Sequence, residues 1–389
     1  MKEGVKMTDP TKQNIGIIGG GQLGKMMILE AKKMNFDVII LDPTLNCPAH
    51  SIADQHLEAS FDDKKAIKKL ADKSDILTYE FEHIDVEALK ELEQEGYKVY
   101  PTAKSLNLIQ DKFVQKFVLK EAGLPVPDFI KVTEKTDIKE AGENFGYPLM
   151  LKSCKGGYDG KGNAVIDNKD KVEFAFNQLG AGNNGLMVEE FIPFKKEISV
   201  IIGRGLNDDK KVYPIGENEH RDNILYTTKV PAEISNEVKK TAIELAFDVI
   251  EVFEGVGIFC IEMFVSQDDE LLINEIAPRP HNSGHYSIEG SITSQFEQHI
   301  RAITGLPLGS TELLKPIVMR NILGSDKEGK AVVLGMKKAL EIPEIKVHIY
   351  GKEINRPGRK MGHLTATADN LKEATRRAFK ASELIKIMS

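Results

Sequence analysis

The sequence predicts an α/β fold that is followed by an α+β fold, and two observations lead to this prediction. The first hundred residues alternate short apolar runs with helical periodicity, as a parallel open sheet does. From Tyr147 onward the chain is rich in strands, at least two of which are joined by a short turn, which favours antiparallel pairing. A chain of 389 residues is long enough for two to three domains of roughly 150 residues each.

The first region begins as a βαβ unit and continues in the same alternation. Strands are expected at residues 14–18, 38–41, 76–79 and 98–100, and helices at 23–34, 66–71 and 86–95. Ligands bind at the carboxyl ends of the strands in open parallel sheets. We therefore expect a binding site at this edge.

A second region opens with a charged helix over residues 111–123, which ends at Gly123 and is followed by Pro125 and Pro127. Beyond it, a long helix is expected at 235–253 and strands at 148–152, 164–166, 186–191, 198–202, 212–215, 258–265 and 271–276. After Pro307, a smaller region has expected strands near 316–323 and 347–350 and a final helix at 371–385. We interpret the second region, up to Pro307, as α+β with an antiparallel component.

Composition and charge exclude several classes of function. With 41% hydrophobic and 29% charged residues, the chain is an ordinary globular protein. Its net charge of −7 argues against nucleic acid and anionic membranes as partners, because both need a basic face. Cys47, Cys154 and Cys260 have no metal-binding spacing, so we expect reduced thiols in the cytoplasm and no structural zinc. The polar start, where Met7 is an alternative initiation site, does not resemble a signal peptide, and no membrane span is expected.

A glycine-rich turn joins the first expected strand to the first expected helix. Gly19, Gly21 and Gly24 satisfy the pattern GxGxxG, and Asp42 ends the second strand, as in dinucleotide-binding proteins. The physical meaning is broader, because a helix N-terminus offers its N–H groups to any anion. Three interpretations stay open at this point: a nicotinamide cofactor, a phosphorylated substrate, or a tight turn without a ligand.

A second glycine-rich segment, residues 152–162, contains three lysines and four glycines between two expected strands. Glycines allow such a loop to close over phosphates, whose charge the lysines and backbone amides meet. The order of residues differs from that of a P-loop. Lys152, at a strand end, is a candidate phosphate contact, and Lys112 is a second; the alternative is a solvated loop.

Acidic and apolar residues follow the strand that begins at residue 186. An adenine ring needs an apolar slot with backbone groups at its edge, and a carboxylate binds ribose hydroxyls. This segment offers all three, although carboxylates at a strand end are commonly only solvated. The candidates are Glu189, Glu190, Phe191, Ile192 and Glu197.

Two carboxylates are expected to face each other in a hairpin whose turn centres between Asp268 and Asp269. In that register Glu262 lies directly opposite Glu275. Like charges that face each other destabilise a strand pair, and among apolar neighbours their repulsion would be barely screened. Mg²⁺ would compensate the charge, and Asn274 would add an amide oxygen. A structural network with lysine or arginine is the alternative.

The loop after this hairpin carries Arg279, His281 and Asn282 between and beyond two prolines. A guanidinium, an imidazole and an amide beside a metal site suit a small anion. Each residue alone would more often be a loop contact. The hypothesis of an anion site therefore depends on their combination.

Four segments together resemble the ATP-grasp superfamily and, within it, the 5-(carboxyamino)imidazole ribonucleotide synthase family. They are Gly19-Gly-Gly-Gln-Leu-Gly24, Tyr79-Glu-Phe-Glu-His83, Gly156-Gly-Tyr-Asp-Gly-Lys-Gly162 and Arg279-Pro-His-Asn-Ser-Gly-His285. The resemblance implies an ATP-grasp fold in three parts. These would be a Rossmann-like domain at 1–106, an ATP-grasp domain at 107–308 with its lid at about 125–192, and a small C-terminal domain at 309–389.

The same resemblance implies the reaction. ATP and bicarbonate would form carboxyphosphate, which carboxylates the exocyclic amine of 5-aminoimidazole ribonucleotide and releases ADP and phosphate, in purine synthesis. The enzyme would be a carbon–nitrogen ligase that uses ATP and Mg²⁺. It would be a cytoplasmic homodimer.

Site residues implied by the resemblance fall into four groups. The ATP site would contain Lys112, Lys152, Gly157, Tyr158, Asp159, Gly160, Lys161, Gly162, Asn163, Glu189, Glu190, Phe191, Ile192, Glu197, His220, Asn274 and Glu275. Mg²⁺ would be held by Glu262 and Glu275. Bicarbonate or carboxyphosphate would be held by Arg279, His281, Asn282 and Lys352, and the substrate nucleotide by Gly21, Gln22, Leu23, Glu80, Tyr158, Asp159 and Arg359. The family often has arginine at the position of Lys112, so the charge is kept here but a bidentate contact is not.

A metal hairpin, a lysine-rich loop and an anion loop have no use in hydride transfer, whereas phosphoryl transfer needs charge neutralisation and positioning. We therefore interpret the first glycine turn as the cup for a substrate phosphate. Three alternative functions remain, and a different observation would identify each of them. A formate-dependent glycinamide ribonucleotide transformylase would require formate, an NAD-binding oxidoreductase would bind nicotinamide, and an ATP-sensing module would bind nucleotide without turnover.

Overall fold

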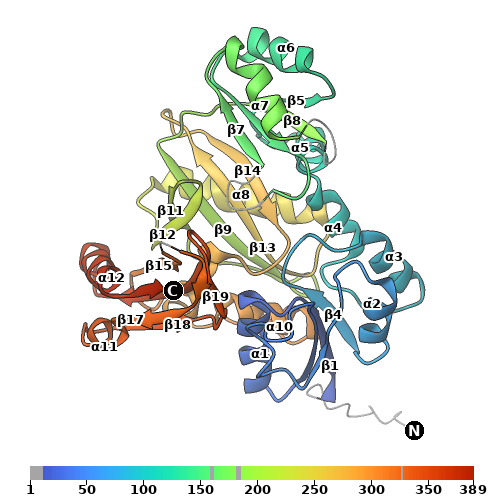
Figure 1. The fold of residues 1–389 in the computed structure, drawn as a ribbon, viewed down its shortest axis with the longest axis vertical. Coiled ribbons are helices and arrows are strands. Elements are labelled where there is room, and N and C mark those ends of the chain that lie inside the picture. Colours follow the sequence, from blue (N-terminus) through green and yellow to red (C-terminus); the bar gives the residue numbers. More distant parts are fainter. Residues whose placement is uncertain (1–11, 158–161, 181–184, 326) are drawn as a thin grey trace.

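The structure is a computed structural model that describes residues 12–157, 162–180, 185–325 and 327–389. Figure 1 shows an N-terminal sheet with its helices in blue, a long central sheet, and a smaller green unit at the opposite end of the molecule. The C-terminal segment, in red, lies beside the N-terminal part. Residues far apart in the sequence therefore meet near the middle of the molecule.

The N-terminal part is a four-stranded sheet with the order β3-β2-β1-β4. Its elements are β1 (Asn14–Ile18), α1 (Gln22–Lys33), β2 (Asp37–Leu41), β3 (Gln55–Leu57), α2 (Lys64–Ala71), β4 (Ile76–Tyr79) and α3 (Val86–Gln94). All its pairs are parallel, which confirms the predicted open sheet. Of the strand expected at 98–100, only Val99 forms a bridge, which is parallel to Leu77 of β4. Pro101 has no N–H to extend the ladder.

The central sheet has nine strands and only antiparallel pairs, in the order β14-β13-β9-β11-β12-β15-β20-β18, with β10 beside β9. They are β9 (Lys196–Arg204), β10 (Lys210–Val212), β11 (Gly216–Arg221), β12 (Ile224–Val230), β13 (Gly257–Val265), β14 (Leu271–Ala277), β15 (Ile317–Leu323), β18 (Ile345–Ile349) and β20 (Lys360–Thr367). The predicted antiparallel component is confirmed. The strand expected at 212–215 is wrong, since β10 ends at Val212 and Pro214 lacks the donor to continue it.

One long helix, α8 (Asn236–Phe253), covers a face of the central sheet. Ser235 caps it by accepting a hydrogen bond from the N–H of Val238. Its apolar residues recur at helical spacing, and Ala242, Val249 and Phe253 are fully buried against β9 and β13. This core makes the sheet a firm support for side chains on its opposite face.

The green unit of Figure 1 is a second antiparallel sheet with its own core. Its strands have the order β5-β8-β6-β7. They are β5 (Phe129–Val132), β6 (Leu149–Ser153), β7 (Asn163–Ile166) and β8 (Leu186–Glu190), with helices α6 (Lys135–Phe145) and α7 (Val172–Gln178). Two helices, α4 (Ala103–Gln110) and α5 (Lys112–Glu121), precede this unit; Asp111 caps α5, and Gly123 follows its end with φ 74°.

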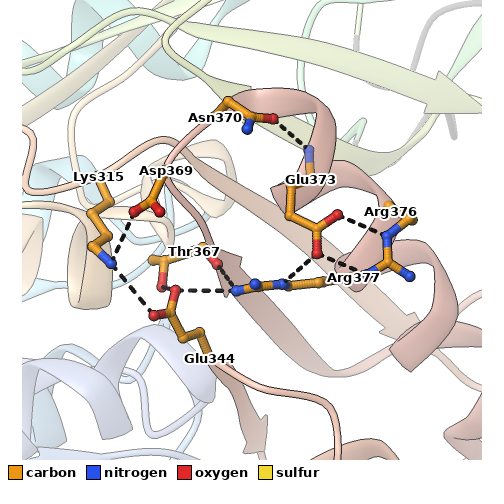
Figure 2. A network of polar contacts seen from close by, with 8 residues as sticks. All are labelled: Lys315, Glu344, Thr367, Asp369, Asn370, Glu373, Arg376 and Arg377. Carbon is orange, nitrogen blue, oxygen red and sulfur yellow. Dashed lines mark hydrogen bonds and ion pairs between the residues drawn. The ribbon is translucent and has the colours of Figure 1, made fainter.

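The C-terminal part continues the central sheet, because β15 pairs with β12 and then with β20. Its other elements are β16 (Gly329–Lys330), β17 (Val332–Leu334), α11 (Met336–Leu340), β19 (Ile354–Asn355), α12 (Leu371–Leu384) and β21 (Lys386–Met388). Figure 2 shows a polar network at the start of α12, where Glu373 binds Arg376 and Arg377, and Glu344 links Arg377 to Lys315. These contacts are mostly exposed, so solvent screens them and they contribute little to stability.

The N-terminal and central parts are joined by α10 (Gln295–Thr304), which packs against α1. His299 of α10 accepts a hydrogen bond at Nδ1 from Ile258 N at 3.2 Å, so its Nε2 donates to Thr78 Oγ1 at 2.8 Å. Burial lowers the pKa of His299 to about 3, so the joint stays neutral. In the part of the chain that is described, no helix is both long and apolar enough to cross a membrane.

Candidate active site

The glycine-rich turn before α1 holds the carboxylate of Glu80. Glu80 accepts hydrogen bonds from the N–H groups of Gly21 and Gly24, the latter at 2.7 Å. A Cβ at Gly21 would lie 2.5 Å from Glu80 Oε1, so the absence of a side chain is needed for this contact. Among the described residues, no acceptor lies on the N–H groups of Gln22 and Leu23. These two donors at the helix N-terminus remain for an anion.

A row of lysines and carboxylates lies between α5, the green unit and β14. Lys152 Nζ lies 2.6 Å from Glu189 Oε2, and Lys112 Nζ lies 2.6 Å from Glu275 Oε1. Lys116 Nζ lies 3.5 Å from the other carboxylate oxygen of Glu189, Oε1. Burial opposes ionisation of Glu189, but Lys116 and Lys152 outweigh it and lower the pKa of Glu189. The row therefore carries three cations and two carboxylates, a surplus that suits phosphates.

In the hairpin of β13 and β14, Glu262 lies opposite Glu275 as predicted. The register between this pair and the turn differs from the predicted one. Nearer the turn, Met263 pairs with Ile273, so Asn274 is an extra residue on β14. The turn centre between Asp268 and Asp269 is therefore wrong, and a β-bulge at Asn274 restores the register. The bulge brings two successive side chains to the lysine row, because Asn274 accepts from Lys152 at 3.3 Å and Glu275 pairs with Lys112.

The two facing glutamates do not simply repel each other, as the sequence had led us to expect. Burial opposes ionisation of Glu275, but Lys112 outweighs it and lowers the pKa of Glu275. Glu262 has Glu197 as its strongest charged neighbour, and burial together with Glu197 raises its pKa to about 8. His220 Nδ1 lies 3.3 Å from Glu197 Oε2. Repulsion at Glu262 therefore comes mainly from β9, not from across the hairpin.

These donors fit a magnesium ion. One ligand atom each of Glu197, His220 and Glu262 lie within 4.8 Å of one another. The buried carboxylate of Glu262 has an unfavourable charge that a divalent cation would stabilise, and Glu275 faces it across the hairpin. Carboxylate and amide oxygens are the ligands that hard cations prefer.

The loop that carries Arg279, His281 and Asn282, here called the anion loop, follows β14 and lies beside Glu262. His281 Nδ1 lies 3.8 Å from Glu262 Oε1, and Arg279 Nε lies 2.8 Å from Glu82 Oε1. Burial and the charge of Arg279 lower the pKa of His281 well below its usual range, so its ring is neutral. Asn282 is buried, and neither amide atom has a hydrogen-bond partner in the described structure. The buried amide of Asn282, in the same loop as Arg279, can therefore donate its N–H groups to a small polar anion.

The segment expected to bind adenine begins at the end of β8, next to Glu189, which pairs with Lys152. β8 ends at Glu190, whose N–H donates to Asp128 O at 2.9 Å, and Phe191 and Ile192 follow half-buried. Asn163 pairs with Lys152 across β6 and β7. Gly157 and Gly162 flank predicted contacts that lie outside the described residues: Tyr158, Asp159, Gly160 and Lys161.

A small pocket connects the lysine row with the N-terminal part. Its walls include Lys112, Glu275 and Gly157 on one side and Glu82 and His83 on the other. Glu82 is also the partner of Arg279. The pocket thus lies between the predicted nucleotide contacts and the segment that carries Glu80.

The C-terminal part contributes Lys352 to the edge of the glycine turn. Burial raises the pKa of Glu80, while its amide donors and the charge of Lys352 oppose this rise. Lys352 Nζ also donates to Lys360 O at 2.8 Å. Arg359 donates to Ile354 O at 2.7 Å within its own part of the chain, so its contact with a substrate phosphate stays a prediction.

Three polar residues near the site were not expected from the sequence. Lys116 is 2% exposed and donates to Ile273 O at 3.0 Å, next to the bulge. Gln115 accepts from Ile276 N and donates to Ile276 O, so α5 covers the open edge of β14. Glu82 binds Arg279. Two signals were available: Lys116 follows Lys112 by one helical turn, and Glu82 lies in the segment Tyr79-Glu-Phe-Glu-His83.

Comparison with known proteins identifies the family. Three domain families match: the ribonucleotide synthetase preATP-grasp domain at residues 12–110, the ATP-grasp domain at 117–296, and the phosphoribosylaminoimidazole carboxylase C-terminal domain at 317–377. The N5-carboxyaminoimidazole ribonucleotide synthase of Staphylococcus aureus (strain COL) is 43% identical over 360 residues, which are 92% of this chain and 94% of that one. The chain belongs to the N5-carboxyaminoimidazole ribonucleotide synthase family.

Solved structures of the N5-carboxyaminoimidazole ribonucleotide synthase family have the same fold. The Thermotoga maritima structure is 46% identical, with a TM-score of 0.88, and the match covers 97% of this chain and 99% of that one. An Aspergillus clavatus structure in complex with ADP and 5-aminoimidazole ribonucleotide is 35% identical, with a TM-score of 0.89, covering 96% and 100%. The expected ATP-grasp fold, with its N-terminal parallel sheet and small C-terminal domain, is confirmed.

Proposed function

We propose that this chain carboxylates the exocyclic amine of 5-aminoimidazole ribonucleotide with ATP and bicarbonate. The products are 5-(carboxyamino)imidazole ribonucleotide, ADP and phosphate, in de novo purine synthesis. The observation that carries the proposal is the position of the anion loop. His281 of this loop lies 3.8 Å from Glu262, and the charge of Arg279 acts on Glu275, which pairs with Lys112 of the lysine row that suits ATP phosphates. The same loop carries the unsatisfied amide of Asn282.

The nucleotide would be held mainly by the lysine row. Lys112 and Lys152 reach phosphates, Asn274 and Glu275 lie beside them, and Glu189 keeps Lys152 in place. The other proposed contacts are Gly157, Tyr158, Asp159, Gly160, Lys161, Gly162, Asn163, Glu190, Phe191, Ile192, Glu197 and His220. Mg²⁺ would be held by Glu262 and Glu275, and when bound it neutralises phosphate charge during phosphoryl transfer.

Bicarbonate would be held by Arg279, His281 and Asn282, with help from Lys352. Arg279 supplies positive charge, since its pKa stays high beside Glu82 despite burial. His281 is neutral, and its Nδ1 accepts from Ser283 N at 3.3 Å. Its Nε2 therefore carries the ring proton and can donate a hydrogen bond to the anion. The carboxyphosphate formed here would lie close to the substrate amine.

The substrate nucleotide would bind at the glycine turn. Its phosphate would accept from the N–H groups of Gln22 and Leu23 beside Gly21, and Glu80 would bind the ribose hydroxyls. Tyr158 and Asp159 would lie near the base, and Arg359 near the phosphate. The free N–H groups at the start of α1 support the phosphate position.

The domain boundaries at 106 and 308, the lid at about 125–192, a homodimer and a cytoplasmic location belong to the same proposal. The separate core of the green unit supports a lid. Three buried unpaired cysteines, Cys47, Cys154 and Cys260, are compatible with a reducing compartment.

ADP release measured with and without 5-aminoimidazole ribonucleotide, in bicarbonate-free and bicarbonate-replete buffer, tests the function. Full turnover is expected only when nucleotide, bicarbonate and Mg²⁺-ATP are all present. Turnover that follows formate instead of bicarbonate would overturn the proposal.

A further inference from the structure

Gln295, the first residue of α10, holds the anion loop from behind. Its side chain is fully buried. Oε1 accepts from His281 N at 2.9 Å, and Nε2 donates to His281 O at 2.7 Å. Both backbone groups of one loop residue are therefore held by one amide. Ser287 adds a second support, because its Oγ accepts from Gln295 N at 2.9 Å and donates to Gly284 O at 2.6 Å.

The orientation of this amide is fixed by His285. The second N–H of Gln295 faces His285 Nδ1 at 3.3 Å, which makes Nδ1 the acceptor and places the ring proton on Nε2. His285 is fully buried, and burial lowers its pKa well below the usual range. The ring therefore stays neutral and keeps its acceptor. All hydrogen-bonding groups of the Gln295 amide are satisfied in one arrangement.

His285 also connects the loop to the C-terminal part of the chain. Its ring centroid lies 4.7 Å from that of His363 on β20, and His363 stacks on His348 of β18 at 4.4 Å with planes 11° apart. His348 Nε2 lies 2.8 Å from Glu289 Oε1, and His363 Nδ1 lies 3.0 Å from Tyr350 OH. The polypeptide continues from Tyr350 to Lys352, the residue proposed to assist bicarbonate.

We propose that Gln295 and His285 are positioning residues for the carboxylation. Gln295 fixes the backbone of His281, which sets where Arg279 and Asn282 meet the anion. His285 fixes Gln295 and ties the loop to the part of the chain that carries Lys352. The inference depends on the proposed function, because it assigns these residues to its bicarbonate site.

The chain provides a matched control three residues along the same helix. Gln298 is also fully buried, and it binds both backbone groups of Gly309, accepting at 2.7 Å and donating at 3.0 Å. Gln295→Leu and Gln298→Leu therefore each remove a buried amide that holds one backbone residue. Only Gln295 holds the anion loop.

The test compares steady-state kinetics of the two variants and the wild type, with bicarbonate and ATP varied separately. Gln295→Leu is expected to lower kcat/KM for bicarbonate on the order of 10- to 100-fold, as a misplaced reacting group does, with the KM for ATP within about twofold. Gln298→Leu should keep both values near wild type while losing similar thermal stability. His285→Phe should shift bicarbonate kinetics in the same direction as Gln295→Leu.

Equal effects of Gln295→Leu and Gln298→Leu on both substrates would overturn the inference, since both glutamines would then be merely structural. If Gln295→Leu does not fold, Gln295→Glu decides, because it keeps the shape and the acceptor for His281 N but loses both donors. A normal KM for bicarbonate in Gln295→Glu would also overturn the inference. A wild type without bicarbonate dependence would instead contradict the proposed function.

Discussion

Replacing Glu262 by glutamine should stabilise the ligand-free protein, and more so at higher pH. Burial and the nearby Glu197 raise the pKa of Glu262 from its ordinary 4.5 to about 8. A carboxyl whose pKa is higher in the folded than in the unfolded chain costs stability as pH rises from about 4.5 to about 8. Glutamine has the same shape and cannot ionise, so the variant avoids this loss.

The size of the effect follows from the rise in pKa. One pKa unit corresponds to about 1.4 kcal/mol, which gives an upper limit of about 5 kcal/mol above pH 8. The Glu262 side chain keeps 15% of its exposure, so solvent lowers the gain to about 2–4 kcal/mol at pH 8 and below about 1 kcal/mol at pH 5. At about 2–4 °C per kcal/mol for a domain of this size, Tm should rise by at least about 4 °C at pH 8.

Thermal unfolding followed by circular dichroism, with EDTA and without nucleotide, measures this difference. Glu275→Gln is the matched control from the facing strand. In the wild type, Lys112 at 2.6 Å outweighs burial and lowers the pKa of the Glu275 carboxyl. The substitution leaves that lysine without its carboxylate, so it should lower Tm at pH 8. Both variants should lose most activity if the two glutamates hold magnesium. A lower Tm for Glu262→Gln, or a gain that does not depend on pH, would refute the reasoning.

Two further substitutions separate the nucleotide site from the anion site. Lys152→Met should raise the KM for ATP at least about tenfold, because it removes a cation from the phosphate row while Lys116 still compensates Glu189; ATP titration checks this, and wild-type affinity would contradict it. Arg279→Ala should raise the KM for bicarbonate far more than that for ATP, because the guanidinium lies on the anion loop; initial rates against each substrate measure it, and the opposite pattern would reassign the loop.

The hairpin shows how far residue patterns reach. Apolar alternation and a polar turn were enough to predict that Glu262 faces Glu275, and the structure has this pair. The turn position was wrong, and the bulge at Asn274 could not be predicted, because it depends on Lys116 and Gln115 binding the outer edge of β14. These contacts join α5 to a strand 157 to 161 residues later, and no local pattern reports them.

Buried polar residues explain why the sequence did not predict the strand β20 (Lys360–Thr367). The strand β20 contains His363 and Thr365, both fully or almost fully buried, so it lacks the alternation that marks a half-exposed strand. Its polar groups are stabilised by Tyr350 and Glu289 from distant segments. The N-terminal sheet was predictable because its strands are continuous apolar runs, as in parallel sheets covered on both faces.

Transfer of oxygen from bicarbonate to phosphate tests the central claim most directly. With ¹⁸O-labelled bicarbonate, ATP and 5-aminoimidazole ribonucleotide, over times shorter than exchange with water, the released phosphate should carry one ¹⁸O atom. This follows because a bicarbonate oxygen attacks the γ-phosphorus and stays on phosphorus when carboxyphosphate gives up its carbon. Unlabelled phosphate at full turnover would contradict the account, since ATP would then not activate bicarbonate in this site.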